Sequence, residues 1–365
     1  MKENGYDPIV KFFISALGLI AIFAVLKELQ HIFIPFLLAY FLFFVFQPFN
    51  KFCERKKIPQ FITIIIDLLI VIVVIWGLSR IILASFNQFE RALPAYETKL
   101  NNMIINTAHT LGISDPIITN FNLLEYLNQT LDFGGLAGGF FSSTLTFFST
   151  IFFVLFFFIF ISGGHHKIVA AIKSRYMNNP QDQNSAENLN DAKSGEREEQ
   201  RGVVIDRAIS TIPQKIQRYV VTKFIISLIT SCAVGIVLWI FGVDFLIVWI
   251  VLTFLLNFIP NIGSVIAVIL PALVALVEFE SFGYALFLVI ILSVVQNLMG
   301  NVLEPKIIGD KLGLNPLVIL LSLLLWGYVW GIVGMFLSVP LTAVIKIIVT
   351  ESDSPNLKFI NNLMG

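Results

Sequence analysis

Hydrophobic residues in this chain gather in long runs separated by short polar segments. Six runs are close to the ~20 residues that an α-helix needs to cross the ~30 Å hydrocarbon core of a bilayer. They cover residues 9–26, 32–49, 61–83, 140–162, 219–241 and 284–300. Two further runs, 245–277 and 314–347, are about 33 residues long, too long for a single span. The pattern predicts an all-α polytopic membrane protein.

The two longest runs are each broken near the middle by residues that stop or kink a helix. The first break contains Asn257, Pro260, Asn261, Gly263 and Ser264, and the second contains Gly327, Gly331 and Gly334. Paired broken apolar segments are a sequence signature of a transporter's substrate site. We therefore predict about six full spans plus two broken hairpins, eight or more hydrophobic helices in all. Whether each hairpin is re-entrant or fully spanning stays open, because hydropathy does not measure depth.

Composition agrees with a chain that lies in lipid. Hydrophobic residues make up 57% of the 365 and charged residues 13%, against roughly 25% charged in soluble domains. The net charge is zero, so nothing favours nucleic acid as a partner. Cys53 and Cys232 match no metal or redox spacing. We expect no cofactor, no metal site and no catalytic residues, and a lipid bilayer as the main partner.

Basic residues set the predicted orientation. Lys51, Arg55, Lys56 and Lys57 crowd one short loop, which the positive-inside rule places in the cytoplasm. Counting the spans back from this loop places the N-terminus of the three helices in residues 1–83 in the cytoplasm. Counting forward places residues 84–139 outside the cell. The loop 163–218 and the tail 348–365 then lie inside.

By the same count, the first hairpin begins and ends on the outer side of the membrane, and the second begins and ends on the cytoplasmic side. Residues 219–347 then form two span-plus-hairpin units of opposite orientation, an inverted repeat that would alternate access around a midplane site. We expect this segment to be the transport core, with the tips of the two breaks close together near the midplane. The fourth span, 140–162, precedes it.

Two segments are predicted outside the lipid. Residues 84–139 carry apolar positions at helical spacing and predict two exterior amphipathic helices. Residues 177–202 are almost without apolar side chains, which predicts a disordered cytoplasmic insert.

Polar residues inside the spans are the candidate site. Gln296, Asn297 and Asn301 form carboxamide faces on the sixth run, and either line a solute path with the breaks or act as packing glue between helices. Asp67 is a functional candidate by default, although its place two turns from the interface favours snorkelling or pairing with a basic group. Glu304 and Asp310 are the other candidates for ion or proton coupling.

Distinctive spacings of Pro, Gly and Asn lie in the C-terminal half. They occupy NFIPNIGSVIAVILPALVAL (257–276) and VVQNLMGNVLEPKIIGDKLGLNPLVILLSLLLWGYVWGIVGMFLSVPLTAVIK (294–346), and an early apolar helix contains Pro35 and Pro48. In these features the chain resembles the autoinducer-2 exporter family, also called the PerM-like permeases. The resemblance covers the whole length, while the insert 177–202 departs from the usual short loop.

The resemblance implies an oligomeric, polytopic inner-membrane transporter. Members of the family are linked to export of autoinducer-2 and others to sodium/proton antiport, so the partner is a small polar solute or a monovalent cation. An amide-lined break suits a neutral, hydroxyl-rich solute, whereas antiport needs a buried carboxylate, and these are scarce. A non-transporting membrane scaffold is the third alternative, but it does not explain two broken hairpins.

Overall fold

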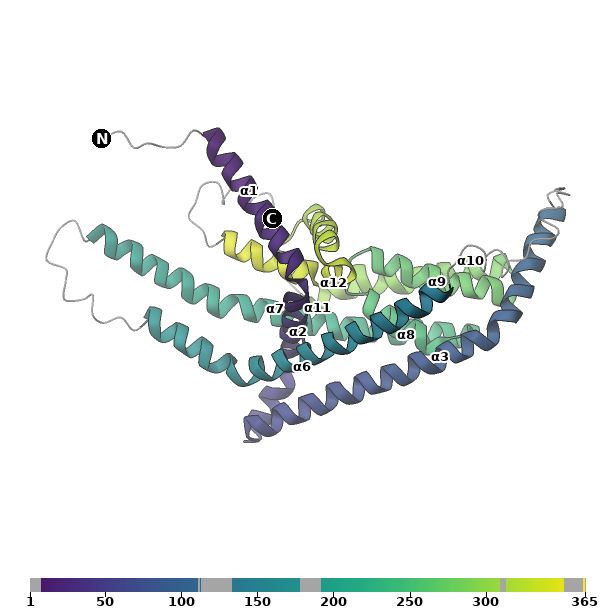
Figure 1. Cartoon of the computed structure of the whole chain (residues 1–365), viewed down its shortest axis with the longest axis horizontal. Coiled ribbons are helices and arrows are strands. Elements are labelled where there is room, and N and C mark those ends of the chain that lie inside the picture. The colour runs from purple at the N-terminus through teal and green to yellow at the C-terminus, as the bar shows by residue number, and fades with distance from the viewer. Residues whose placement is uncertain are drawn as a thin grey trace. The chain divides into compact units, whose positions relative to one another are not determined.

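The computed structural model describes residues 8–110, 112, 133–177, 192–308, 313–350 and 364, and these residues contain helices and turns but no strand. The chain is drawn in Figure 1. Its helices are α1 (Pro8–Glu28), α2 (Gln30–Arg55), α3 (Gln60–Thr110), α6 (Phe133–Met177), α7 (Ala192–Phe241), α8 (Leu246–Leu256), α9 (Ile262–Phe279), α10 (Phe282–Asn297), the π-helical segment η2 (Leu298–Leu303), α11 (Glu304–Ile308) and α12 (Pro316–Thr350).

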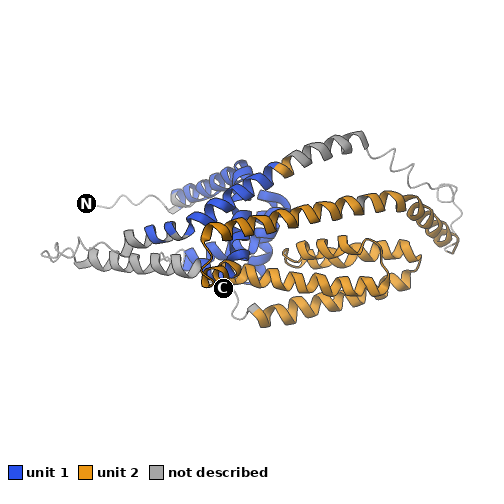
Figure 2. Ribbon diagram, turned by 90° about the horizontal axis from the view of Figure 1, so that it is seen from below, with its two compact units in different colours: residues 1–48, 149–216, 314–365 blue, residues 49–148, 217–313 orange. Residues whose placement is uncertain are grey.

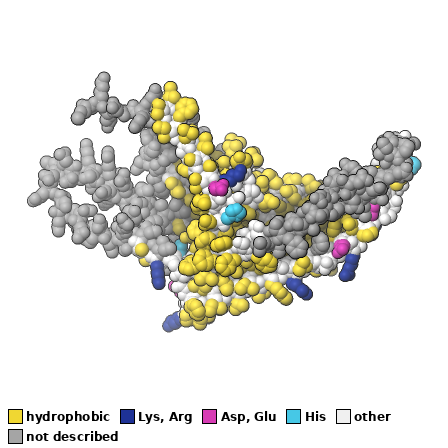
Figure 3. Space-filling model, in the orientation of Figure 1, with side chains coloured by type: hydrophobic (Ala, Val, Ile, Leu, Met, Phe, Trp, Pro, Cys, Tyr) yellow, Lys and Arg dark blue, Asp and Glu magenta, His cyan; other side chains and the backbone are white. Residues whose placement is uncertain are grey.

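The structure confirms the all-α polytopic membrane fold. Among the described residues, seven helical stretches are long and apolar enough to cross a membrane. Large apolar side chains are exposed on them, including Trp239 at 71% and Ile332 at 74%. Figure 3 shows hydrophobic side chains over much of the described surface of the face drawn. Contiguous apolar surface on this scale marks a contact with lipid or protein rather than with water.

α3 differs from the sequence prediction because it is one helix where a span and a separate amphipathic helix were expected. It runs from Gln60 to Thr110 and passes through Pro94 without ending. The polar C-terminal half of α3 is docked by two hydrogen bonds to other segments. The Tyr96 hydroxyl donates to Asp244 Oδ2 at 2.8 Å, and Lys99 Nζ donates to the Glu278 carbonyl oxygen. The second predicted exterior helix, after residue 112, lies outside the described residues.

The predicted disordered insert, 177–202, is described only at its ends. Met177 is the last residue of α6, and α7 begins at Ala192, so residues 192–202 belong to a helix. Residues 192–202 read AKSGEREEQRG, in which Ala, Lys, Glu, Gln and Arg all have high helix propensity. The lack of apolar residues therefore did not prevent a helix there. Residues 178–191 lie outside the described part.

The chain divides into two compact units, coloured separately in Figure 2. Unit 2 consists of residues 49–148 and 217–313. Its core is formed by buried residues of α7 to α10 and is joined by Ala92 and Tyr96 of α3. α9 packs against α8 and α10, and α3 packs against α8 and α9. This unit contains the first predicted break and the carboxamide residues.

Unit 1 consists of residues 1–48, 149–216 and 314–365. Its apolar core is built on Trp326, Val329 and Trp330 of α12, packed against side chains of α1 and α2. The Trp330 indole Nε1 donates to the Leu26 carbonyl oxygen at 2.9 Å. Of the predicted transport core, 219–347, the two clear spans and the first hairpin thus belong to unit 2, and the second hairpin, 314–347, belongs to unit 1.

Candidate functional site

The first predicted break is present as a tight turn between α8 and α9. Asn257 caps the end of α8, and Asn261 precedes α9 with a φ of 60°, a left-handed value that asparagine tolerates better than most residues. A Cβ on Gly263 would lie 1.8 Å from the Leu256 carbonyl oxygen, so only glycine fits. α8 has 11 residues, about 16 Å of helix, too short to cross the ~30 Å core.

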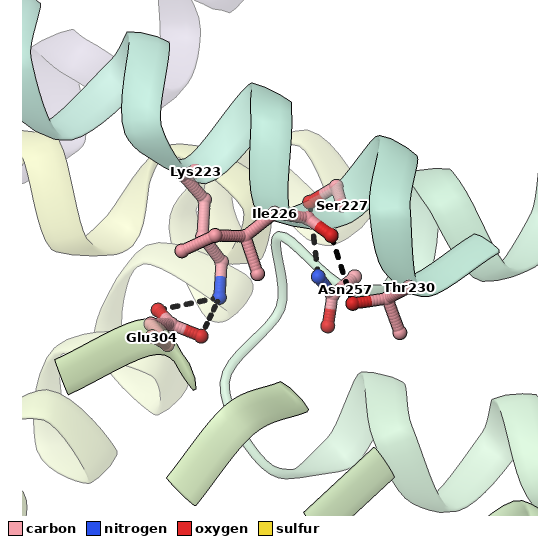
Figure 4. A network of polar contacts seen from close by, with 6 residues as sticks. All are labelled: Lys223, Ile226, Ser227, Thr230, Asn257 and Glu304. Atoms are coloured by element: carbon pink, nitrogen blue, oxygen red, sulfur yellow. Dashed lines mark hydrogen bonds and ion pairs between the residues drawn. The ribbon is translucent and has the colours of Figure 1, made fainter. Parts of the chain in front are cut away.

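One face of α7 is polar and buried, and it lies against this turn. Its buried polar side chains recur at helical spacing and are Thr222, Lys223, Ser227, Thr230 and Ser231. Asn257 Nδ2 donates to Ser227 Oγ at 3.0 Å, and Thr230 Oγ1 donates to the Ile226 carbonyl oxygen at 2.8 Å. Figure 4 shows this network from close by. The break that the sequence predicted therefore faces hydroxyl groups that the sequence prediction did not include.

Lys223 and Glu304 form a buried ion pair beside these hydroxyl groups. Lys223 Nζ donates to both carboxylate oxygens of Glu304, at 2.8 and 2.9 Å. The two side chains are 7% and 21% exposed, and they lie in the candidate spans Pro213–Phe241 and Phe282–Ile307. Glu304 was a predicted candidate, but Lys223 was missed. A lysine inside an apolar run was the available signal, because a charge within a span is a functional candidate by default.

A π-helical segment sets the position of Glu304. η2 covers Leu298–Leu303, between α10 and α11. In an uninterrupted α-helix, a residue eight positions after Gln296 would lie about 80° around the axis from it. The wider turns of a π-helix, with i→i+5 hydrogen bonds, reduce that rotation. The segment therefore brings Glu304 closer to the face of Gln296, and such π-bulges recur at functional sites.

Gln296 and the two asparagines occupy different surroundings. Gln296 is buried, and its Nε2 has no hydrogen-bond partner among the described residues. Asn297 and Asn301 are exposed. Asn301 Nδ2 donates to Asn297 Oδ1 at 2.8 Å, and Asn297 Nδ2 donates to the Ser293 carbonyl oxygen at 2.9 Å. Asn297 and Asn301 thus lie on one face and bond to each other, and the buried donor without a partner belongs to Gln296.

The second predicted break is also present, within α12 of unit 1. Trp330 and Gly331 leave the helical conformation, and Gly331 has φ 61° and ψ −140°. A Cβ on Gly334 would lie 1.9 Å from the Trp326 carbonyl oxygen. Eight residues of straight helix would separate these positions by about 12 Å, so the chain folds back at Gly331. The close approach of the two break tips stays a prediction.

Of the remaining candidates, Pro260 and Ser264 belong to the first turn, where Ser264 Oγ donates to the Asn261 carbonyl oxygen at 2.8 Å. Asp67 is fully buried in α3. Asp310 lies outside the described residues. The cluster of α7, the α8–α9 turn and the segment around η2, called the polar cluster below, thus consists of a neutralised ion pair, hydroxyl groups and carboxamides.

Comparison with known proteins fits this arrangement. The model of the AI-2E family transporters matches residues 13–353. The chain belongs to this transporter family. A putative transport protein of Haemophilus influenzae is 30% identical over 96% of each chain. The AI-2 transport protein TqsA of Escherichia coli is 29% identical over 92% of this chain and 90% of its own, and a putative transport protein of Borreliella burgdorferi is 41% identical over 39% of this chain and 40% of its own.

Proposed function

We propose that this chain exports a small, neutral, hydroxyl-rich solute of the autoinducer-2 type, and that the polar cluster binds it. The observation that carries the proposal is the neutralised Lys223–Glu304 pair next to hydroxyl and carboxamide groups. A hydroxyl-rich solute both donates and accepts hydrogen bonds, and the hydroxyls and carboxamides of the cluster do the same. The cluster therefore offers a neutral solute partners without an uncompensated charge.

Sodium/proton antiport is the alternative within the same family. A cation site needs a carboxylate whose charge is not already neutralised. Both oxygens of Glu304 are bound by Lys223, so Glu304 does not meet this requirement. The remaining carboxylate candidate that the structure describes is Asp67, which lies on α3 apart from the polar cluster. The solute function is therefore the better supported one, and the polar cluster also argues against a mere scaffold.

The proposal includes a place for the protein in the cell. We expect a multi-pass protein of the bacterial inner membrane, assembled as a homo-oligomer, with both termini in the cytoplasm. The basic loop of Lys51, Arg55, Lys56 and Lys57 supports this orientation. The relative from Escherichia coli is named for autoinducer-2 transport, which supports the solute class.

Transport by purified protein in sealed liposomes tests the proposal. Vesicles loaded with autoinducer-2 should release it down an imposed gradient, faster than protein-free vesicles. Asn257→Leu removes a carboxamide of the polar cluster and its hydrogen bond to Ser227, worth about 0.5–1.5 kcal/mol, and should slow release several-fold. Cys232→Ala, on the exposed side of α7, is the matched control and should release the solute normally. Sodium flux driven by a pH gradient without autoinducer-2 release would favour the antiporter, and no flux of either would favour the scaffold.

A further inference from the structure

Asp67 lies at the corner between α2 and α3, inside unit 2. α2 ends at Arg55 and α3 begins at Gln60, so Asp67 lies about 10 Å along α3 from its start. Its side chain is 0% exposed. Snorkelling, which the sequence favoured, would leave the carboxylate in contact with water. The complete burial of Asp67 contradicts that expectation.

The carboxylate has only a weak partner in the described part of the chain. The Asn50 carboxamide acts on Asp67 as a hydrogen-bond donor, and no charged group acts on Asp67. No hydrogen bond of full geometry reaches Oδ1 or Oδ2 of Asp67, and the buried Oδ1 of Asn50 is without a partner. The basic side chains of the corner, including Arg55 and Lys57, are exposed. The Thr63 hydroxyl, one turn before Asp67, donates to the Pro59 carbonyl oxygen at 3.4 Å.

An ionised carboxylate in such a place is unfavourable. Burial removes its hydration, and no cation or set of donors replaces the lost water. Binding a proton would remove this unfavourable charge. A metal ion would meet the same need, but hard cations are held by about six oxygen ligands. Among the described residues there is also no cluster of three His, Cys, Asp or Glu side chains.

We propose that Asp67 is a proton-binding site within the third span, and that it takes up and releases one proton in each transport cycle. The proton comes from water on one side, converts the Asp67 carboxylate to the neutral acid, and returns to water on the other side when the carboxylate re-forms. Coupling of this proton to a solute rests on the proposed function, whereas the proton site itself does not. The site is distinct from the polar cluster, so solute and proton bind to different residues.

Infrared spectroscopy of the purified protein tests the proton site without any transport. At neutral pH the wild type should show a carboxylic-acid C=O stretching band that disappears on raising the pH. The band should be missing from Asp67→Asn, which has the same shape but no proton to lose. Glu54→Gln removes an exposed carboxylate at the same corner and should keep the band. If Asp67→Asn fails to fold, Asp67→Glu replaces it in the test. Asp67→Glu keeps a carboxyl group in the same place and should shift the band rather than remove it.

Two spectroscopic results would overturn the assignment. A band that persists unchanged in Asp67→Asn would belong to another residue. A spectrum without the band at neutral pH would show that Asp67 is ionised, which contradicts a protonated resting state.

Liposome transport separates the proton site from the proposed function. With autoinducer-2 as the probe, an imposed pH gradient should change the rate of release by wild type at least tenfold. Asp67→Asn should still exchange the solute across the membrane but lose the response to pH. Exchange that is insensitive to pH in the wild type would overturn the coupling. Wild-type protein with the infrared band but no solute exchange would refute the proposed function and leave the proton site standing.

Discussion

The ion pair between Lys223 and Glu304 makes a sharp prediction about stability. Lys223→Met keeps the length of the side chain and removes its charge, which leaves the carboxylate of Glu304 buried without its cation. Breaking a buried pair from one side costs about 3–5 kcal/mol. Because the Glu304 side chain is 21% exposed, water can solvate part of the charge, and the cost should fall near the lower limit, about 3 kcal/mol.

Thermal unfolding of the purified protein in detergent measures this loss. Domains of 150–250 residues lose about 2–4 °C of Tm per kcal/mol, and longer chains lose less. Lys223→Met should therefore lower Tm by on the order of 5 °C. The double variant Lys223→Met/Glu304→Leu removes both charges and should recover most of the loss, since an apolar pair often replaces a buried ion pair without cost. Nearly equal losses in the single and double variants would refute the reasoning.

The same variants test whether the Lys223–Glu304 pair has a role in transport. If the charges only stabilise the fold, the double variant should transport autoinducer-2 at the wild-type rate once it is stable. If the charges hold the geometry of the polar cluster, the double variant should recover its stability but still transport autoinducer-2 slowly. Measuring Tm and release from liposomes on the same preparations separates stability from transport.

Three further predictions follow from the structure. Gly263→Ala places a Cβ on a backbone oxygen and should cost more than about 2 kcal/mol of stability, whereas Gly283→Ala, with nothing within 4 Å, should leave the Tm equal or higher. Asn297→Leu should abolish release with the oligomer intact if the carboxamides line the path; loss of the oligomer first, seen by size-exclusion chromatography, would show that they act as packing glue. A cysteine at Lys56 should be protected from an impermeant thiol reagent in intact cells and one at Thr110 should react, and the reverse labelling would overturn the orientation.

The breaks could be predicted from sequence because Asn, Pro and Gly are conspicuous in an apolar run. Asn261 and Gly331 lie where the backbone takes positive φ values, which the residue types themselves favour. Lys223 was missed for a different reason: it lies close to the start of the fifth span, where basic residues are common. Its burial depends on Glu304, which is 81 residues away, and no local pattern reports such a contact.

The π-helical segment and the length of α3 were also beyond local reasoning. LMGNVL, the sequence of η2, has no residue that distinguishes a π-helix from an α-helix. The change from apolar to amphipathic sequence after residue 83 predicted a span followed by a separate helix. The contacts of Tyr96 and Lys99 with the turns of unit 2 hold the two parts in one helix, because tertiary context can override local preference.

The two breaks share a backbone device but differ in the side chains around it. Gly263 and Gly334 each bring a helix start against a carbonyl oxygen of the preceding arm. The first turn is bordered by carboxamides and hydroxyls, whereas the second is packed by two tryptophans, of which Trp326 keeps an indole Nε1 without a partner among the described residues. The hydrogen-bonding groups that we propose for the solute thus lie beside the first turn, whereas the surroundings of the second turn are mainly apolar. A scaffold gives no reason for this division of chemistry between two turns of the same geometry.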